Sequence, residues 1–135
     1  MRSFLCFFFT IGLLVSCNPK DPKKYVWQTK EVTATAYNSL AYQTSDQPNI
    51  TAFGDSLKPG MKCIAVSRDL LALGLKHNTL VTIDGLEGIY LVKDKMNRRW
   101  KNRIDIYMDN DVKAAKKWGR KKVTISYRAE VKDSI

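Results

Sequence analysis

The sequence predicts an all-β domain, a closed barrel of six short strands with one or two short helices. Short runs rich in β-branched and apolar residues alternate with turn-forming residues between positions 32 and 127, which is the pattern of strands. Helical patterns are confined to two brief segments. Because an open sheet of short strands would leave exposed edges, we expect the sheet to close into a barrel.

Six segments carry the strand pattern. In the first, residues 32–37, apolar and polar residues alternate, as in a strand with one buried face. The pair Asp84-Gly85 predicts a tight hairpin between the third and fourth strands. The five later strands are expected at residues 63–67, 80–83, 88–93, 103–107 and 122–127.

Two helical segments complete the predicted domain. Residues 68–73 predict a helical turn that Gly74 ends. Residues 112–118 are good helix formers that follow N-cap candidates and precede Gly119, at the position where glycine commonly ends helices. The polar segment 38–62 contains prolines and glycines and is expected to be a long loop that carries function.

The N-terminal segment has the features of an export signal. Arg2 is followed by an apolar run over residues 4–15, which is shorter than the ~20 residues that a membrane-spanning helix needs. Residues 14–17, Leu-Val-Ser-Cys, resemble the lipobox of bacterial lipoproteins, which implies cleavage before Cys17 and lipidation of its thiol. The alternative is an ordinary secretory signal in which the cysteine is a coincidence.

The expected organisation has four parts. These are a lipoprotein signal peptide over residues 1–17, a polar tether over 18–30, one barrel domain over 31–128 and a tail over 129–135. The mature length suits a single domain with one modest core. We expect the protein in the cell envelope, anchored to the membrane through Cys17 on the periplasmic side of the outer membrane.

Composition limits the partners. The formal net charge of +10 predicts an anionic neighbour, and for an exported lipoprotein we expect anionic lipid or peptidoglycan carboxylates, not nucleic acid. A solvated basic surface without a partner is the alternative. Cys6 would be removed with the predicted signal peptide and Cys17 would be lipidated, so Cys63 is the one cysteine left in the domain. We therefore expect a buried, inert thiol and no intrachain disulfide. The spacing of residues predicts no metal site and no cofactor.

Asp94 and Asp105 are the candidate catalytic residues. Asp94 follows the fourth predicted strand, and Asp105 lies within the fifth, between two isoleucines. Strand alternation directs Asp105 away from those isoleucines, and therefore outward if they fill the core. A second carboxylate nearby would raise the pKa of one of the pair, which keeps an acid protonated near neutral pH. Ordinary surface charges are the alternative interpretation.

The two aspartates belong to a pattern that resembles the 3D domain, a family named for its three aspartates. Asp94 and the segment Arg103-Ile104-Asp105 resemble the last two of them. Further matches are Thr51-Ala52-Phe53-Gly54, Pro59-Gly60 before Ile64-Ala65-Val66, and Trp118-Gly119-Arg120 before Val123-Thr124. The resemblance covers residues 32–127. It implies a double-psi β-barrel similar to that of membrane-bound lytic transglycosylase A, with Asp105 at the position of the catalytic acid.

Two segments depart from the family pattern. The family's first aspartate follows Ile-Ala-Val directly, whereas this chain has Ser67 there and Asp69 two residues later. The family's Asp-Thr-Gly-Gly loop is Asp94-Lys95-Met96-Asn97 here, without the glycines that let a backbone approach a sugar closely. The resemblance implies substrate-binding positions at Thr51, Gly54, Asp69, Arg103 and Trp100. Trp100 either stacks on a sugar or caps the barrel, and the single histidine, His77, is expected to be a turn residue.

The resemblance implies a lytic transglycosylase that cleaves peptidoglycan glycan strands. In this hypothesis Asp105 protonates the leaving oxygen and then accepts the proton of the sugar's C6 hydroxyl, while Asp94 raises the pKa of Asp105. Two other hypotheses stay open. One is a non-catalytic peptidoglycan-binding or scaffolding lipoprotein on the same barrel, and the other is a basic envelope domain without glycan specificity.

Overall fold

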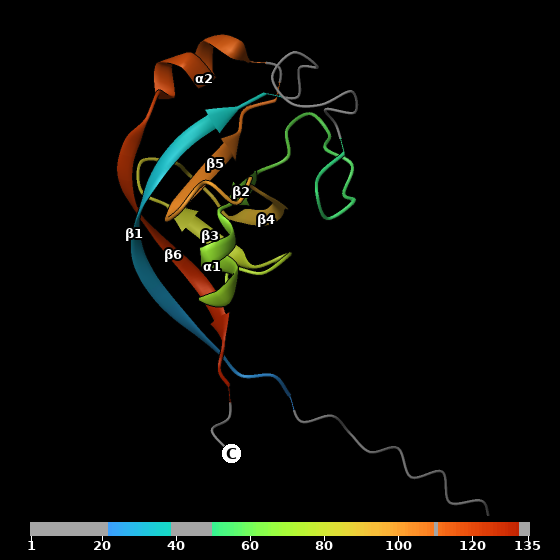
Figure 1. Cartoon of the computed structure of the whole chain (residues 1–135), viewed down its shortest axis with the longest axis vertical. Coiled ribbons are helices and arrows are strands. Elements are labelled where there is room, and N and C mark those ends of the chain that lie inside the picture. Colours follow the sequence, from blue (N-terminus) through green and yellow to red (C-terminus); the bar gives the residue numbers. More distant parts are fainter. Residues whose placement is uncertain (1–21, 39–49, 110, 133–135) are drawn as a thin grey trace, which may run out of the picture.

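Six strands form a closed barrel, and two short helices flank it (Figure 1). The computed structural model describes residues 22–38, 50–109 and 111–132; the predicted signal peptide and the lipidation candidate Cys17 lie outside them. The strands are β1 (Tyr25–Tyr37), β2 (Cys63–Val66), β3 (Leu80–Ile83), β4 (Tyr90–Lys95), β5 (Arg103–Tyr107) and β6 (Lys121–Glu130). The helices are α1 (Arg68–Ala72) and α2 (Val112–Trp118). The predicted fold class is confirmed.

The strands are hydrogen-bonded around the barrel in the order β1-β5-β2-β4-β3-β6. Two neighbouring pairs, β1 with β5 and β2 with β4, run parallel, and the other pairs run antiparallel. Parallel neighbours cannot be joined by a tight hairpin, so the chain crosses the barrel between them. This mixed order is consistent with a double-psi barrel.

The barrel is filled by β-branched side chains from alternate strand positions and by leucines from α1 and the segment after it. The fully buried members are Val32, Ile64, Val66, Leu70, Leu75, Val81, Val92, Ile104, Ile106 and Ile125. Burying one such side chain stabilises a protein by about 1.5–3 kcal/mol. Because Ile104 and Ile106 are among these buried residues, they point into the core, as the alternation of β5 predicts. Asp105, which lies between them, points outward.

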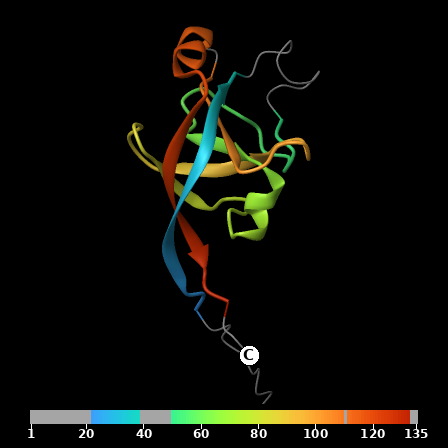
Figure 2. The same cartoon turned by 60° about the vertical axis from the view of Figure 1, so that its left-hand side comes forward.

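The outer strands are longer than the sequence predicts. Strand β1 begins at Tyr25, not residue 32, and β6 ends at Glu130, so the expected tether over 18–30 and tail over 129–135 are wrong in part. Their register pairs Tyr25 with Glu130 and Lys30 with Ile125. Beyond the barrel the two strands form a ribbon (Figure 2), and most residues of its β1 strand from Tyr25 to Lys30 are exposed. A strand without a buried face leaves no alternation in the sequence to detect.

Helix α2 has the ends that the sequence predicts. The Asp111 side chain accepts a hydrogen bond from the Ala114 N–H at 2.8 Å, and Gly119 ends the helix with a positive φ of 67°. Within the described residues, no helix has the length and apolar character needed to span a lipid bilayer.

We predict that the ribbon contributes to stability. All six strands lie within residues 25–130, so a fragment of residues 18–135 contains every strand pairing and should fold by itself. A fragment that begins at Glu31 loses the pairing of residues 25–30 with β6. With about 0.5–1.5 kcal/mol for each lost backbone hydrogen bond, we expect its free energy of unfolding to fall by about 3 kcal/mol. Urea unfolding measures this, and a fragment beginning at Pro22 is the matched control. If the fragments that begin at Pro22 and at Glu31 are equally stable, the ribbon does not contribute to stability.

Candidate functional site

The two candidate aspartates lie in one row across the outside of the barrel wall. The register pairs Thr35 with Asp105, Asp105 with Ala65, and Ala65 with Asp94. Residues paired directly across strands point to the same face, so these four side chains lie side by side on β1, β5, β2 and β4. Neighbouring strands are about 4.8 Å apart, which places the two aspartate backbones about 10 Å apart on either side of Ala65.

An irregularity in β4 brings Asp94 into this row. The register of β2 and β4 shifts between Ile64 and Ala65, which pair with Val92 and Asp94, so Lys93 is left as an extra residue. Val92 points into the core, and regular alternation would point Asp94 into the core as well. The extra residue turns Asp94 outward instead, which is a common use of a β-bulge beside functional sites.

Asp105 is held by a short chain of side-chain hydrogen bonds. Its Oδ1 accepts from the Thr35 hydroxyl at 2.9 Å, and the Thr35 oxygen accepts from Nε and Nη2 of Arg103 at 3.3 and 3.1 Å. Burial raises the pKa of Asp105, and the charge of Asp94 adds to the rise, while Thr35 and Arg103 oppose it; the net shift is upward. Thr35 did not stand out in the sequence because its role depends on the β1–β5 register.

Asp94 connects the barrel wall to the loop before β2. Its Oδ1 accepts hydrogen bonds from the backbone N–H groups of Ala52 and Lys95, at 2.7 and 2.8 Å. Burial raises the pKa of Asp94 more than these two hydrogen bonds lower it. Both candidate acids are therefore more easily protonated than an exposed aspartate, although each has one oxygen in use.

The predicted substrate residues Thr51 and Gly54 build the turn that reaches Asp94. Thr51 is buried; its N–H donates to the Asp55 carbonyl at 2.9 Å, and its hydroxyl accepts from the Asp55 N–H at 3.0 Å. Gly54 closes the turn with a φ of +84°, a conformation that favours glycine. The structure thus brings Thr51 and Gly54 together with Asp94, in a supporting position.

A cluster around Asp55, which sequence reasoning missed, fastens the same turn. Asp55 binds His77 and also accepts from Lys93 Nζ at 3.3 Å, and the Phe53 ring stacks on His77 with the ring centroids 4.8 Å apart. Although burial acts in the opposite direction, His77 and Lys93 lower the pKa of Asp55. His77 occupies a turn, as predicted, and in addition holds the loop.

A pocket opens beside Asp105. It has a volume of about 310 Å³ and lies between the end of β1, Asp105 and α2, with Tyr37 and Lys116 in its lining. Burial raises the pKa of Tyr37, and Cys63 and the two carboxyl groups raise it further, so its hydroxyl stays protonated. This hydroxyl is a buried donor without a partner among the described residues, and so is Nη1 of Arg103, although Arg103 does not line the pocket.

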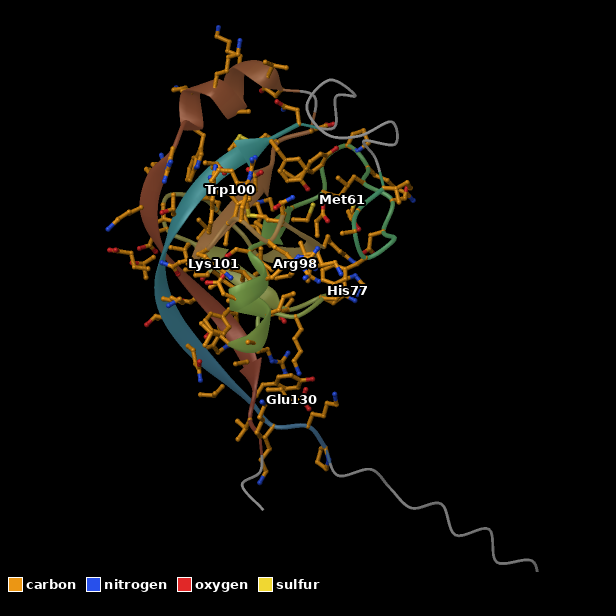
Figure 3. All side chains as sticks on the ribbon, viewed as in Figure 1. Met61, His77, Arg98, Trp100, Lys101 and Glu130 are labelled. Atoms are coloured by element: carbon orange, nitrogen blue, oxygen red, sulfur yellow. The ribbon has the colours of Figure 1, made fainter. Side chains whose placement is uncertain are left out.

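The loop before β2 covers part of this face and forms a second, smaller apolar cluster outside the barrel. Leu57, Cys63 and Tyr107 are its buried members, and Tyr37 and Met61 pack against them; Met61 is labelled in Figure 3. Burial raises the pKa of the Cys63 thiol to about 12. Cys63 is buried in this cluster, as the sequence predicts, and among the described residues it is a free thiol.

Asp69 and Trp100 lie at the other end of β5 and are not brought into the row. Asp69 Oδ2 accepts a hydrogen bond from the Asn102 N–H at 2.8 Å. Burial raises the pKa of Asp69, but its hydrogen bonds lower it by more, so the net shift is downward. The guanidinium carbons of Arg99 and Arg103 lie 4.7 and 3.9 Å from the centroid of the Trp100 ring. The Trp100 ring is thus in contact with two arginines, and Trp100 is not among the residues that pack against the barrel core.

Ser67 occupies the position of the family's first aspartate and has a backbone role. It is fully buried, its hydroxyl accepts from the Arg103 N–H at 2.9 Å, and its own N–H donates to the Arg103 carbonyl at 2.8 Å. Within the described part of the chain, no group of three His, Cys, Asp or Glu side chains is arranged to hold a metal ion.

We predict that Asp105→Asn stabilises the protein at neutral pH. Because the pKa of Asp105 is higher in the folded than in the unfolded state, the folded state binds more protons, and stability falls as pH rises above the ordinary value of 3.8. The amide removes this loss and still accepts from Thr35. Thermal melts should show a rise of about 4 °C at neutral pH, typical of a change near 1 kcal/mol, that disappears in strong acid. Asp84→Asn, at an exposed turn, is the control. An equal rise at both pH values would argue against a buried, ionised Asp105.

Comparison with known proteins finds a distant structural neighbour. No family model and no curated protein matches the chain. The apo structure of an expansin from Clavibacter michiganensis aligns with a TM-score of 0.46 and 19% identity, over 80% of this chain and 52% of that one. A point mutant of that expansin in complex with cellohexaose gives 0.46 and 18% over the same shares. The chain spans about half the length of these structures, and its barrel is distantly similar to theirs.

Proposed function

We propose that the protein is a lipid-anchored envelope protein that binds peptidoglycan glycan strands at the pocket beside Asp105. The observation that carries this proposal is the hydroxyl of Tyr37, a residue of the pocket lining, which is a buried donor without a partner among the described residues. A buried donor left unpaired costs about 1–3 kcal/mol, so such groups mark a place where a ligand or water completes the hydrogen bonding. Sugar hydroxyls supply the acceptors, and Lys116 at the pocket suits the carboxylates of the peptide stems.

Three features favour binding over turnover. Asp105 has one oxygen engaged by Thr35, and the Arg103 guanidinium supports its ionised form. Asp94 is engaged by two backbone N–H groups. After Asp94 the chain continues β4 into the buried Met96, whose N–H donates to the Val66 carbonyl at 2.9 Å. No glycine there allows the backbone to approach a sugar closely.

A lytic transglycosylase is the second candidate, and the raised pKa values of Asp105 and Asp94 favour it. Groups with shifted pKa values beside a pocket are typical of acid–base sites. Asp105 would donate its proton to the glycosidic oxygen as the glycosidic bond breaks. It would then accept the proton of the C6 hydroxyl while the C6 oxygen attacks the anomeric carbon. The sugar supplies its own nucleophile, so one carboxyl group suffices where most glycosidases need two.

Purified sacculi test both candidates with the fragment of residues 18–135. We expect co-sedimentation with sacculi at moderate salt and no release of 1,6-anhydro products by mass spectrometry. Lys116→Glu should weaken binding about tenfold, because it reverses a charge at the pocket. Lys113→Glu makes the same change on an exposed residue of α2 outside the pocket lining and should leave binding nearly unchanged.

Cleavage by the wild-type fragment would replace the binding proposal. If anhydro products appear and disappear in a folded Asp105→Asn variant, Asp105 is the acid, and a loss of 10² to 10⁴-fold is the size expected for general acid–base catalysis. Failure to sediment with sacculi at all would defeat both candidates and leave a basic envelope domain without glycan specificity.

The lipid anchor is a separate prediction that rests on residues 14–17 and the apolar run before them. Cys17→Ser removes the thiol that would carry the acyl chains. In cells that process lipoproteins, the native protein should incorporate labelled fatty acid, and the Cys17→Ser protein should incorporate none. Cys63→Ser is the control and should be labelled like the native chain. Labelling of the Cys17→Ser protein would refute the assignment.

A further inference from the structure

The ribbon of β1 and β6 forms one end of the molecule, and α2 lies at the opposite end (Figures 1 and 2). The ribbon's end consists of residues 23–27 and 128–132, and the hydrogen bond from the Val131 N–H to the Lys24 carbonyl, at 2.9 Å, extends the pairing past β6. Both described chain ends leave from here. The ribbon end is therefore the part of the fold nearest to the predicted anchor.

Large apolar side chains gather at the ribbon end. Trp27 is 51% exposed, Tyr25 and Val26 are each 44% exposed, and Val131 is 41% exposed. These are four of the seven large hydrophobic residues that are exposed in the described part of the chain. Single exposed apolar residues are common, but a group of them with two aromatic rings is typical of a contact surface.

Cations surround these apolar side chains. The ribbon end carries Lys23, Lys24, Arg128 and Lys132 against one carboxylate, Glu130, which pairs with Lys23 at 3.3 Å. The Arg128 guanidinium carbon lies 4.2 Å from the centroid of the Tyr25 ring. Among the described residues, three of these cations are thus left without a carboxylate partner. Aromatic rings among cations are the combination that binds the interface of an anionic membrane.

We propose that the ribbon end lies on the anionic lipid surface, with Trp27 at the level of the headgroups and the cations on lipid phosphates. In its cellular setting this inference rests on the lipid anchor of the proposed function. From Cys17 to Pro22 the chain advances five residues, which span at most about 18 Å. So short a connection keeps the ribbon end close to the membrane and raises its effective concentration there.

This contact would also orient the site. The pocket beside Asp105 is lined by residues of α2, and α2 lies at the end of the molecule away from the ribbon (Figure 1). With the ribbon end on the membrane, the α2 residues of the pocket lie at the end of the molecule that is distant from the lipid. The ribbon end would then fix the distance between the membrane surface and the pocket.

Vesicles test the proposal without the anchor. The fragment of residues 18–135, which holds every strand pairing, should sediment with vesicles of phosphatidylcholine and phosphatidylglycerol, weakly with pure phosphatidylcholine, and less as salt rises. Lys24→Glu with Lys132→Glu should weaken binding at least about 25-fold, from about fivefold per cation lost. Trp27→Ala should weaken it about tenfold. Both variants must keep the wild-type circular dichroism.

Two control variants match these changes at other places. Ile89→Ala shortens an apolar residue that is 52% exposed outside the ribbon, and Lys113→Glu with Lys117→Glu reverses two charges on α2; neither should alter vesicle binding. The proposal is overturned if the fragment does not bind the anionic vesicles, or if the α2 pair weakens binding as much as the ribbon pair. Since no glycan is present, these outcomes are independent of the sacculus result.

Discussion

The β-bulge at Lys93 is the local constraint on which the candidate site depends. Without it, Asp94 would follow Val92 into the core, where an ionised carboxylate has no place. With it, Asp94 joins Asp105 on the outer face, with Ala65 between them. The bulged residue is itself used, because Lys93 Nζ reaches Asp55 at 3.3 Å and Asn78 Oδ1 at 2.6 Å. One extra residue thus turns a carboxylate outward and supplies the cation that holds the neighbouring turn.

The hydrogen-bonding groups that stabilise the half-buried carboxylates of Asp94 and Asp105 also limit the chemistry of these carboxylates. Burial alone would make both ionised forms costly, and the hydrogen bonds to Asp94 and Asp105 offset part of that cost. The bond from the Ala52 N–H also ties the loop to the barrel, and the Asp55–His77 contact keeps that loop in place. The loop, the bulge and the two aspartates therefore form one connected unit. A substitution of His77 would change the position of the loop and thereby the hydrogen bonding of Asp94.

How far the sequence predicts this structure depends on whether a strand has a buried face. Ile104, Asp105 and Ile106 show clean alternation, so the outward direction of Asp105 followed from the sequence, as did the strands and α2. The ribbon did not, since residues 25–30 are mostly exposed and their alternation has no apolar side. Thr35 was also missed as the hydrogen-bond partner of Asp105, and Tyr37 as a neighbour of Asp105 in the pocket lining. Their positions depend on the parallel β1–β5 register, which is a long-range property that local periodicity does not contain.

For the two proposed functions, glycan binding and glycan cleavage, the deciding property is the protonation state of Asp105 when a sugar covers it. A bound glycan would displace water from the pocket and deepen the desolvation that already raises the pKa of Asp105. The Arg103 guanidinium, which reaches Asp105 through the Thr35 hydroxyl, acts in the opposite direction. If desolvation dominates, Asp105 becomes a proton donor once the glycan is bound; if Arg103 dominates, Asp105 stays a carboxylate and accepts hydrogen bonds from sugar hydroxyls. The Arg103–Thr35–Asp105 chain, more than the mere presence of an aspartate, would therefore decide between the two proposed functions.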